Sequence, residues 1–223
     1  MSNERRNSRI DLVALGPHLA SRDVHKVVAN AMRHGVRAVC VAPVWTGRVA
    51  TMVRGSGLRV CSAVAFPHGT SKSTVKAIEA TSTIKDGADE IEVVAHLAPL
   101  VAGDLDASRS ELMEIVRAAR STRRDVGIHV TIESAVLAGM GKAALELACR
   151  AVRESGCDGI VTSSGFHPAG DATAEAVRSL KSFAHDLTIK AAGAIESEAL
   201  ARSLLDAGAD RIAVADAAAI GMV

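Results

Sequence analysis

The sequence contains few aromatic residues, with one tryptophan, three phenylalanines and no tyrosine among 223 residues. Proteins that hold single-stranded nucleic acid commonly stack its bases on aromatic side chains, and this composition argues against that mode of binding. An excess of charge of one sign is also missing, because 26 basic and 25 acidic residues leave a formal net charge of +1. Such a chain has no overall field that attracts nucleic acid or an anionic membrane surface. We therefore expect neither as a partner.

Long apolar runs are absent as well, since none approaches the roughly 18 residues that span a bilayer. The first nine residues lack the apolar segment of a secretory signal, so we expect a cytoplasmic protein with no membrane contact. The four cysteines have no close metal-binding spacing, and they are Cys40, Cys61, Cys149 and Cys157. Thiols spaced in this way are typical of reduced, buried cysteines. We expect no metal and no other cofactor.

Short apolar runs alternate with longer amphipathic segments along the whole chain, a pattern that predicts strands and helices in turn. The expected strands are 10–15, 38–42, 59–65, 90–95, 127–132, 159–162, 188–191 and 211–214. The expected helices lie near 22–34, 45–54, 72–86, 107–121, 141–154, 172–184 and 197–207. The strands are rich in Val, Ile and Ala, which suits parallel strands covered on both faces. The sequence therefore predicts an α/β fold.

Three similar phrases recur where an expected helix passes into an expected strand. They are 86–89 (Asp-Gly-Ala-Asp), 155–158 (Ser-Gly-Cys-Asp) and 207–210 (Ala-Gly-Ala-Asp). Each glycine is placed to end a helix. A repeated connection with no break in composition predicts a single (β/α)8 TIM barrel over residues 10–223, with residues 1–9 as a flexible tail. An open doubly wound sheet is the alternative, although no G-x-G-x-x-G follows the first strand.

Charged residues interrupt several of the expected strands. Because successive side chains alternate across a strand, Glu92 and His96 share one face of the fourth strand, and His129 and Lys190 take comparable positions on the fifth and seventh. Barrel interiors are normally filled by Val, Ile and Leu. We interpret these residues as a polar cluster in the upper barrel. The alternative is that they point outward beneath helices or form an inert internal ion pair.

Several phrases, in order along the strands, resemble those of the deoxyribose-phosphate aldolase family of class I, DeoC-like aldolases. They are 39–43 (Val-Cys-Val-Ala-Pro), 65–69 (Ala-Phe-Pro-His-Gly), 87–92 (Gly-Ala-Asp-Glu-Ile-Glu), 130–134 (Val-Thr-Ile-Glu-Ser), 162–165 (Thr-Ser-Ser-Gly) and 190–195 (Lys-Ala-Ala-Gly-Ala-Ile). Asp11 in the first strand also matches the family pattern. The resemblance covers nearly the whole chain and implies the same barrel.

The resemblance also implies positions for the catalytic groups. The family forms an imine on a sixth-strand lysine, and that position is Val161 here, whose isopropyl group has no lone pair. The family's seventh-strand lysine corresponds to Lys190 and its fourth-strand aspartate to Glu92. His129 and His96 stand where the family has lysine and asparagine. We therefore expect Lys190 as the amine nucleophile and Glu92, His96 and His129 as acid–base groups, with Asp11 beside them.

Substrate contacts follow from the same resemblance. The expected contact residues are Cys40, Ser163, Ser164, Gly165, His167, Gly193 and Asp216. The family holds the substrate phosphate with glycine amides after the seventh strand and a serine pair after the eighth, where this chain has Ala194 and Ala215-Asp216. A carboxylate repels a phosphate dianion strongly at intermediate dielectric. We therefore expect a substrate that carries no phosphate.

Together these observations predict a divergent deoxyribose-phosphate-aldolase-like carbon–carbon lyase that acts on a small carbonyl compound. One alternative is an enzyme of the same fold that forms no imine and catalyses isomerisation, cyclisation or elimination, with Lys190 as an electrostatic stabiliser. Another is a non-catalytic relative that binds a metabolite. We expect the protein to assemble as a homodimer.

Overall fold

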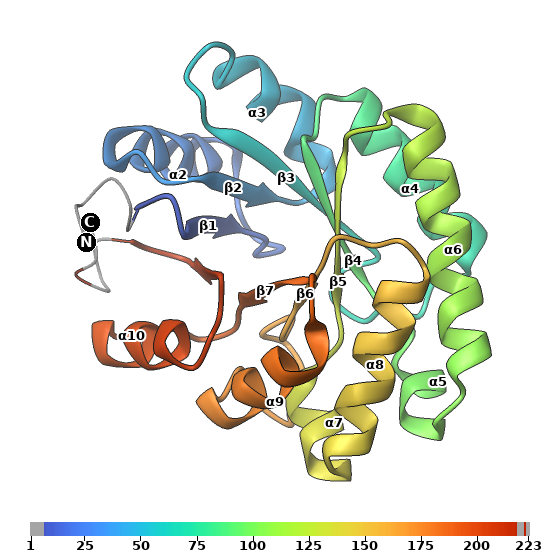
Figure 1. The fold of residues 1–223 in the computed structure, drawn as a ribbon. Helices are drawn as coiled ribbons and strands as arrows, with labels where there is room; N and C mark the ends of the chain where they lie inside the picture. Colours follow the sequence, from blue (N-terminus) through green and yellow to red (C-terminus); the bar gives the residue numbers. More distant parts are fainter. Residues whose placement is uncertain (1–6, 218–220, 222–223) are drawn as a thin grey trace.

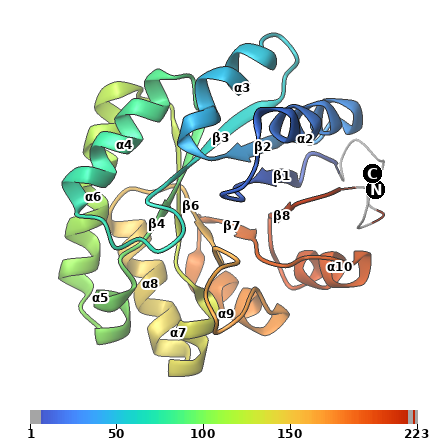
Figure 2. The ribbon, with the colours of Figure 1, turned by 180° about the vertical axis from the view of Figure 1, so that it is seen from behind.

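The structure is a computed structural model and describes residues 7–217 and residue 221. Eight parallel strands pair in chain order, and the last pairs with the first, so that the sheet closes into a barrel. Helices surround the strands, as two opposite views show (Figure 1, Figure 2). The (β/α)8 prediction is confirmed, and the open doubly wound sheet is excluded by the pairing of β1 with β8. Within the part of the chain described, no helix has the length and apolar character to cross a membrane.

The strands begin at the residues expected from the sequence and end at the expected residue or one residue earlier. They are β1 (Ile10–Ala14), β2 (Ala38–Val41), β3 (Arg59–Val64), β4 (Glu90–Val94), β5 (Gly127–Thr131), β6 (Gly159–Val161), β7 (Thr188–Ala191) and β8 (Arg211–Val214).

Among the described residues, the helices match the seven expected segments and add two short ones, α5 and α7. They are α2 (Ser21–His34), the 3-10 turn η1 (Pro43–Trp45), α3 (Thr46–Met52), α4 (Ser73–Lys85), α5 (Leu97–Ala102), α6 (Leu105–Thr122), α7 (Ser134–Met140), α8 (Lys142–Glu154), α9 (Ala174–Ala184) and α10 (Glu198–Asp206).

The main hydrophobic core lies between the outer faces of the strands and the helices that cover them. In α2, for example, Val24, Val28 and Ala31 fall at helical spacing and are all buried. Such a stripe directs one face of an amphipathic helix onto the sheet. A second, separate apolar cluster contains Val161 and Ala213 and belongs to the inside of the barrel. The barrel interior is therefore not an extension of the main core.

The three repeated phrases have one structural role. Their final residues Asp89, Asp158 and Asp210 each accept a hydrogen bond from a backbone N–H of the preceding strand, at 2.9, 2.7 and 2.8 Å respectively. The carboxylate thus satisfies a backbone donor at the amino-terminal end of the barrel, where the ladder of strand hydrogen bonds begins. The repeat ties β3 to β4, β5 to β6 and β7 to β8.

The segment expected to be a flexible tail is described only from residue 7 onward, so the prediction for residues 1–6 lies outside the described residues. Asn7 donates a hydrogen bond to the carbonyl oxygen of His34 at 2.6 Å. Arg9 donates through Nε to the carbonyl oxygen of Asp210 at 2.9 Å and also contacts that of Ala209. These contacts hold residues 7–9 against the end of α2 and the start of β8.

Candidate functional site

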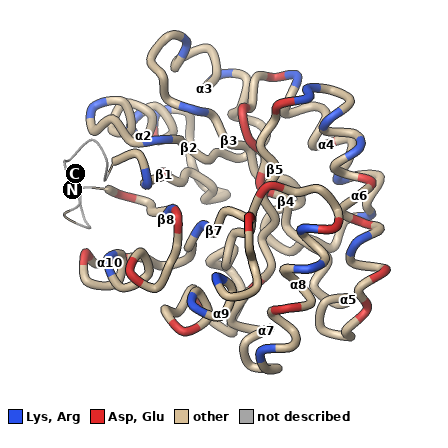
Figure 3. Tube along the Cα trace, in the orientation of Figure 1, with Lys and Arg blue, Asp and Glu red and all other residues tan. Residues whose placement is uncertain are grey.

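Three charged side chains meet inside the barrel. Lys190 on β7 is fully buried, and its Nζ donates a hydrogen bond to Asp11 Oδ2 on β1 at 2.6 Å and another to Glu92 Oε1 on β4. Acidic and basic residues on the central strands are visible along the Cα trace (Figure 3). The inward orientation predicted for Glu92 and Lys190 is confirmed, and the outward alternative is excluded for both.

The surroundings of Lys190 keep it charged. Burial alone would lower the pKa of this ammonium, but the nearby carboxylates of Asp11 and Glu92 outweigh burial and place the pKa well above 10.5. Burial would likewise raise the pKa of Asp11, yet Lys190 and Arg211 hold it below its ordinary value. At neutral pH the resting site therefore contains an ammonium paired with the ionised carboxylate of Asp11.

A network of further charges lies around this triplet. Arg211 NH1 contacts Glu90 Oε2 at 3.0 Å and Asp11 Oδ2 at 3.7 Å. Arg37 NH1 donates to Glu90 Oε2 at 3.1 Å and to Asp11 Oδ1 at 3.4 Å. Arg211 also contacts Nε2 of His129. We call the seven residues of the triplet and this network the charged layer. They are Asp11, Arg37, Glu90, Glu92, His129, Lys190 and Arg211.

His129 is neutral within the charged layer. Burial lowers the pKa of its imidazole well below 6.5, and the adjacent Arg211 lowers it further. A neutral imidazole accepts the hydrogen bond from Arg211 at Nε2 and therefore carries its proton on Nδ1. For Glu90, burial would raise the pKa, but the hydrogen bond from Arg37 and the charge of Arg211 move it far below 4.5. His129 thus acts as a hydrogen-bond acceptor deep in the barrel.

A cavity of about 230 Å³ opens above the charged layer, at the carboxyl ends of the strands. Glu92 forms part of its lining and is the one titratable side chain among the described lining residues. Neither Lys190 nor His129 belongs to that lining. Carboxyl ends of the strands are the usual place for chemistry in a barrel of this kind. Glu92 is thus the point where the charged layer reaches the cavity.

The inner wall of the cavity is apolar. We call Val13, Val161, Ala192 and Ala213 the apolar layer, because they pack together inside the barrel and all line or adjoin the cavity. Val161 is the direct partner of Lys190 across the β6–β7 ladder. The position on β6 that neighbours Lys190 therefore carries a hydrocarbon side chain and not a second amine. This arrangement leaves Lys190 with carboxylates as its charged partners on the cavity side.

The rim of the cavity carries four of the predicted substrate contacts. Ser163, Ser164, Gly165 and Gly193 all line it. Ser163 Oγ is buried and has no hydrogen-bond partner. A buried hydroxyl without a partner is costly, so a ligand or water in the cavity is its natural partner. Gly193 has φ of 124°, and a Cβ there would lie 2.2 Å from Asp171 Oδ1, so only glycine fits.

Cys40, another predicted contact, lies within the barrel wall and not on the cavity. It pairs with Cys61 across β2 and β3, and both thiols are buried. Their sulfur atoms and a Glu92 oxygen lie within 4.8 Å of one another, the one such group of three among the described residues. Burial raises the pKa of Cys61 well above 9.0. Because a cation requires thiolates and Glu92 already bonds the Lys190 ammonium, this group is poorly suited to a metal.

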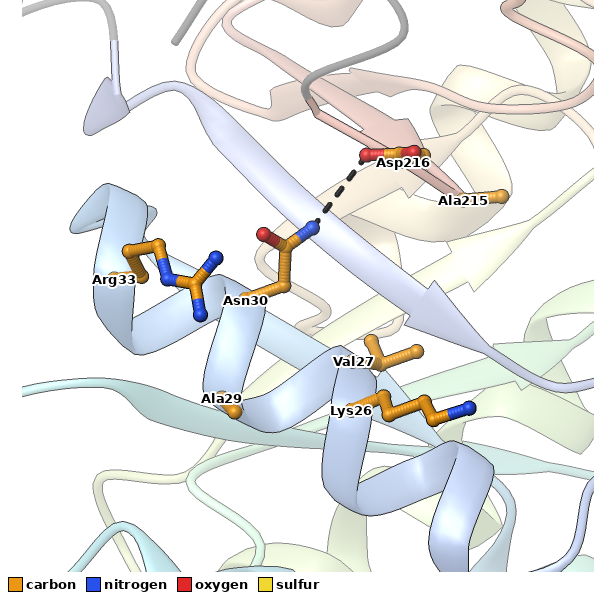
Figure 4. Close-up of a pocket in the computed structure, with 7 residues that line it drawn as sticks. All are labelled: Lys26, Val27, Ala29, Asn30, Arg33, Ala215 and Asp216. Carbon is orange, nitrogen blue, oxygen red and sulfur yellow. Dashed lines mark hydrogen bonds between the residues drawn. The ribbon is translucent and has the colours of Figure 1, made fainter.

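Three other predicted residues are not brought to the cavity. His96 is exposed at the start of α5, where its backbone N–H donates to Glu111 at 3.1 Å. His167 accepts a hydrogen bond at Nδ1 from the Ala169 N–H at 3.1 Å. Asp216 lines a separate pocket beside α2 and accepts from Asn30 Nδ2 at 3.5 Å (Figure 4). Asp216 thus does not lie where a carboxylate would repel a ligand in the cavity.

Sequence reasoning missed Arg37, Glu90 and Arg211 as partners of the charged layer. The signal was present in part, since Glu90 and Glu92 are two residues apart and Arg211 precedes Ala213 by two, so each pair shares a face. It also missed the aromatic pair Phe66 and Phe166 at the cavity, whose rings meet edge to face with centroids 5.2 Å apart. The two phenylalanines belong to different loops, and no sequence pattern links them.

Comparison with known proteins places the chain in a family. Residues 7–223 match the model of the DeoC/LacD family aldolases. A deoxyribose-phosphate aldolase from Mycobacterium bovis is 39% identical over 213 residues, which cover 95% of this chain and 92% of the relative. A deoxyribose-phosphate aldolase from Mycolicibacterium paratuberculosis is 37% identical, with 95% of this chain and 93% of the relative covered.

Solved structures give the same result. A protein described as "QR15, an Aldolase" superimposes with a TM-score of 0.88 at 32% identity, covering 99% of this chain and 95% of the other. The tetrameric deoxyribose-phosphate aldolase of Aeropyrum pernix superimposes with a TM-score of 0.89 at 30% identity, covering 98% and 90%. The resemblance read from the motifs is confirmed, and with it the expectation of an aldolase-like enzyme. The chain belongs to the DeoC/LacD aldolase family.

Proposed function

We propose that this chain is a deoxyribose-phosphate-aldolase-like lyase that cleaves or forms a carbon–carbon bond in a small carbonyl compound that carries no phosphate. The observation that carries the proposal is the position of Glu92. Its carboxylate lines the cavity and is hydrogen-bonded to the buried ammonium of Lys190. A titratable group that reaches an otherwise uncharged cavity from a charged network is the arrangement expected of an acid–base catalyst.

Glu92 would move the proton of the reaction. In the cleavage direction a base removes the proton of a hydroxyl β to the carbonyl, the Cα–Cβ bond breaks, and its electron pair passes toward the carbonyl oxygen to give an enolate. The enolate then takes a proton on carbon from the same acid. The positive charge of Lys190 beneath Glu92 and the partnerless hydroxyl of Ser163 support the negative charge that develops.

The lining of the cavity favours a substrate without phosphate. Among the described residues that line it, none is lysine or arginine, and the one charged side chain is the Glu92 carboxylate. A phosphate dianion in this cavity would lie next to the Glu92 carboxylate. The positive charge of Lys190 would be farther away, because Lys190 lies behind Glu92. Asp216, whose carboxylate was expected to repel a phosphate, lies in the separate pocket beside α2.

A second candidate mechanism uses Lys190 as the nucleophile. Its amine would attack the substrate carbonyl, lose water and form an imine. One observation favours it, namely that Lys190 Nζ bonds directly to the side chain that forms part of the cavity lining. The charged state of the resting amine and its burial favour the first candidate, because attack requires a neutral amine with access to the substrate.

Cleavage of diacetone alcohol into two acetone molecules, followed by NMR, tests the proposal. We expect activity that Glu92→Gln lowers by about a hundredfold or more and that the exposed-site control Glu146→Gln leaves unchanged. Acetaldehyde with cyanoborohydride, followed by peptide mapping, separates the two candidates, with Lys142 as the measure of background labelling. Selective labelling of Lys190 would establish the imine mechanism. No cleavage by the wild type, or cleavage unaffected by Glu92→Gln, would overturn the proposed function.

We also propose that the protein assembles as a homodimer in the cytoplasm. Val44 and Ile78 are 79% and 70% exposed, and such apolar side chains at a surface suit a protein contact. One structural neighbour is tetrameric, so association occurs on this fold. The four free cysteines fit a reducing compartment. Sedimentation velocity of the wild type against Ile78→Asp tests the dimer, and a monomeric wild type would exclude it.

A further inference from the structure

A second pocket of about 400 Å³ adjoins the cavity above Glu92. The two share three lining residues, Leu15, Phe66 and Phe166. Leu15 directly follows β1, and the two phenylalanines follow β3 and β6 in the chain. The pocket therefore lies at the same end of the barrel as the cavity, with a common wall between them.

The common wall consists largely of two aromatic rings. Phe66 and Phe166 meet edge to face, with centroids 5.2 Å apart and ring planes at 84°. An edge-to-face contact contributes only on the order of 1 kcal/mol beyond area burial. Phe166 is 51% exposed, so little packing opposes rotation of its ring toward solvent. Phe166 is the one exposed residue of the three that the two spaces share.

The second pocket is lined mainly by hydrocarbon. Its residues include Pro17, Ala42, Pro43 and Ala63, and none of those described is lysine or arginine. Glu79 reaches it, but one of its carboxylate oxygens already accepts the Ala65 backbone N–H at 2.7 Å. His68 is the other polar side chain of the lining. A pocket lined mainly by hydrocarbon favours an apolar group, because that group leaves water on binding.

We propose that the second pocket binds the apolar tail of the substrate whose carbonyl end lies over Glu92. This assignment rests on the proposed function for the position of the reacting end. The cavity of about 230 Å³ is smaller than the roughly 300–1,000 Å³ typical of ligand sites, and the two spaces together fall within that range. The substrate class is therefore a carbonyl compound with an unbranched or lightly branched hydrocarbon chain.

Binding of straight-chain methyl ketones, from acetone to hexyl methyl ketone, tests the assignment by calorimetry. Once the chain is long enough to pass the phenylalanine pair, we expect each added methylene to tighten binding by about threefold to fourfold, because each leaves water for hydrocarbon. Ala42→Leu fills the second pocket and should remove this gain, while acetone binding stays unchanged. Ala98→Leu, at an exposed position of α5, is the matched control.

The outcomes separate this assignment from the proposed function. Affinity that does not rise with chain length in the wild type overturns the tail pocket, and this measurement requires no variant. A gain that survives in a folded Ala42→Leu protein overturns it as well. If diacetone alcohol is cleaved with dependence on Glu92 but chain length has no effect, only the tail pocket falls. The opposite case is also distinguishable. If affinity rises with chain length, Ala42→Leu removes that rise, and diacetone alcohol is not cleaved, then the tail pocket is supported and the proposed lyase activity is contradicted.

Discussion

The charged layer and the apolar layer fill the interior of the same barrel with different kinds of contact. In the charged layer, buried ions such as Lys190 and Glu90 each contact two or more groups of opposite charge. In the apolar layer, Val161 and Ala213 pack hydrocarbon against hydrocarbon and leave a cavity beside them. Buried charge persists only where it is paired. Glu92 is the member of the charged layer that also lines the cavity, so it is the place where charge meets open space.

The largest expected effect is the loss of the cation at the centre of the charged layer. Lys190→Met leaves Asp11 and Glu92 facing one another without it, and we expect the free energy of unfolding to fall by about 3 to 5 kcal/mol. Urea unfolding measures the change. Lys142→Met removes an exposed lysine and should stay within about 0.5 kcal/mol of the wild type. Equal losses in the two variants would contradict the pairing described for Lys190.

A smaller loss is expected when the acid at the edge of the charged layer is removed. Glu90→Gln removes one of the two carboxylates that Arg37 and Arg211 share, but both arginines keep Asp11, and Arg37 is 22% exposed to water. We expect the free energy of unfolding to fall by about 2 to 3 kcal/mol. The exposed Glu196→Gln serves as the control in the same denaturant titration. A loss as large as that of Lys190→Met would show that water does not reach Arg37.

Acid should weaken the charged layer in two stages. His129 has a lowered pKa in the folded state, so the unfolded chain takes up a proton first as the pH falls below 6.5, and stability decreases. Asp11 and Glu90 also have lowered pKa values when folded, so their contribution is present above their ordinary values of 3.8 and 4.5 and is lost below them. Urea midpoints across this pH range measure both stages.

His129→Gln isolates the first of these stages. The amide oxygen of glutamine can still accept a hydrogen bond from Arg211 but does not titrate. We expect the variant to lose the decrease between pH 6.5 and the carboxylate range, and to keep the later one. Wild-type stability that is flat down to pH 5 would show that the pKa of His129 is not lowered in the folded protein.

The smallest effect is expected in the apolar layer. Val161→Ala removes two methyl groups beside an existing cavity, where they have fewer neighbours to lose, and should cost about 1 kcal/mol. Val39→Ala makes the same change in the main hydrophobic core and should cost more. Thermal unfolding of both variants measures the difference. A larger loss for Val161→Ala would mean that the apolar layer is packed as tightly as the core.

Most of the fold was predictable because strand and helix patterns repeat regularly along the chain. The short helices α5 and α7, of six and seven residues, were missed. The inward position of Glu92 and Lys190 followed from alternation along a strand. That rule stops where the strand stops. β4 ends at Val94 and β8 at Val214, so alternation did not place His96 or Asp216.

The contacts between strands were harder to predict. Which cation pairs with Asp11 depends on the stagger of a closed barrel, which brings residues 179 positions apart within 2.6 Å. Side-chain length also matters, since Arg37 reaches Glu90 from outside β2. Neither of these contacts can be predicted from a local sequence pattern. The catalytic and substrate-binding roles assigned to individual residues stay predictions until the variants above are measured.

The salt bridges of Lys190 join β7 to β1 and β4, which are not its neighbours in the sheet. They cross the interior of the barrel and connect strands that the hydrogen bonds of the sheet do not connect directly. A redesign that replaces this lysine to introduce new chemistry would also lower the stability of the barrel. A protein engineer should keep Lys190 and change the small residues that line the cavity above it.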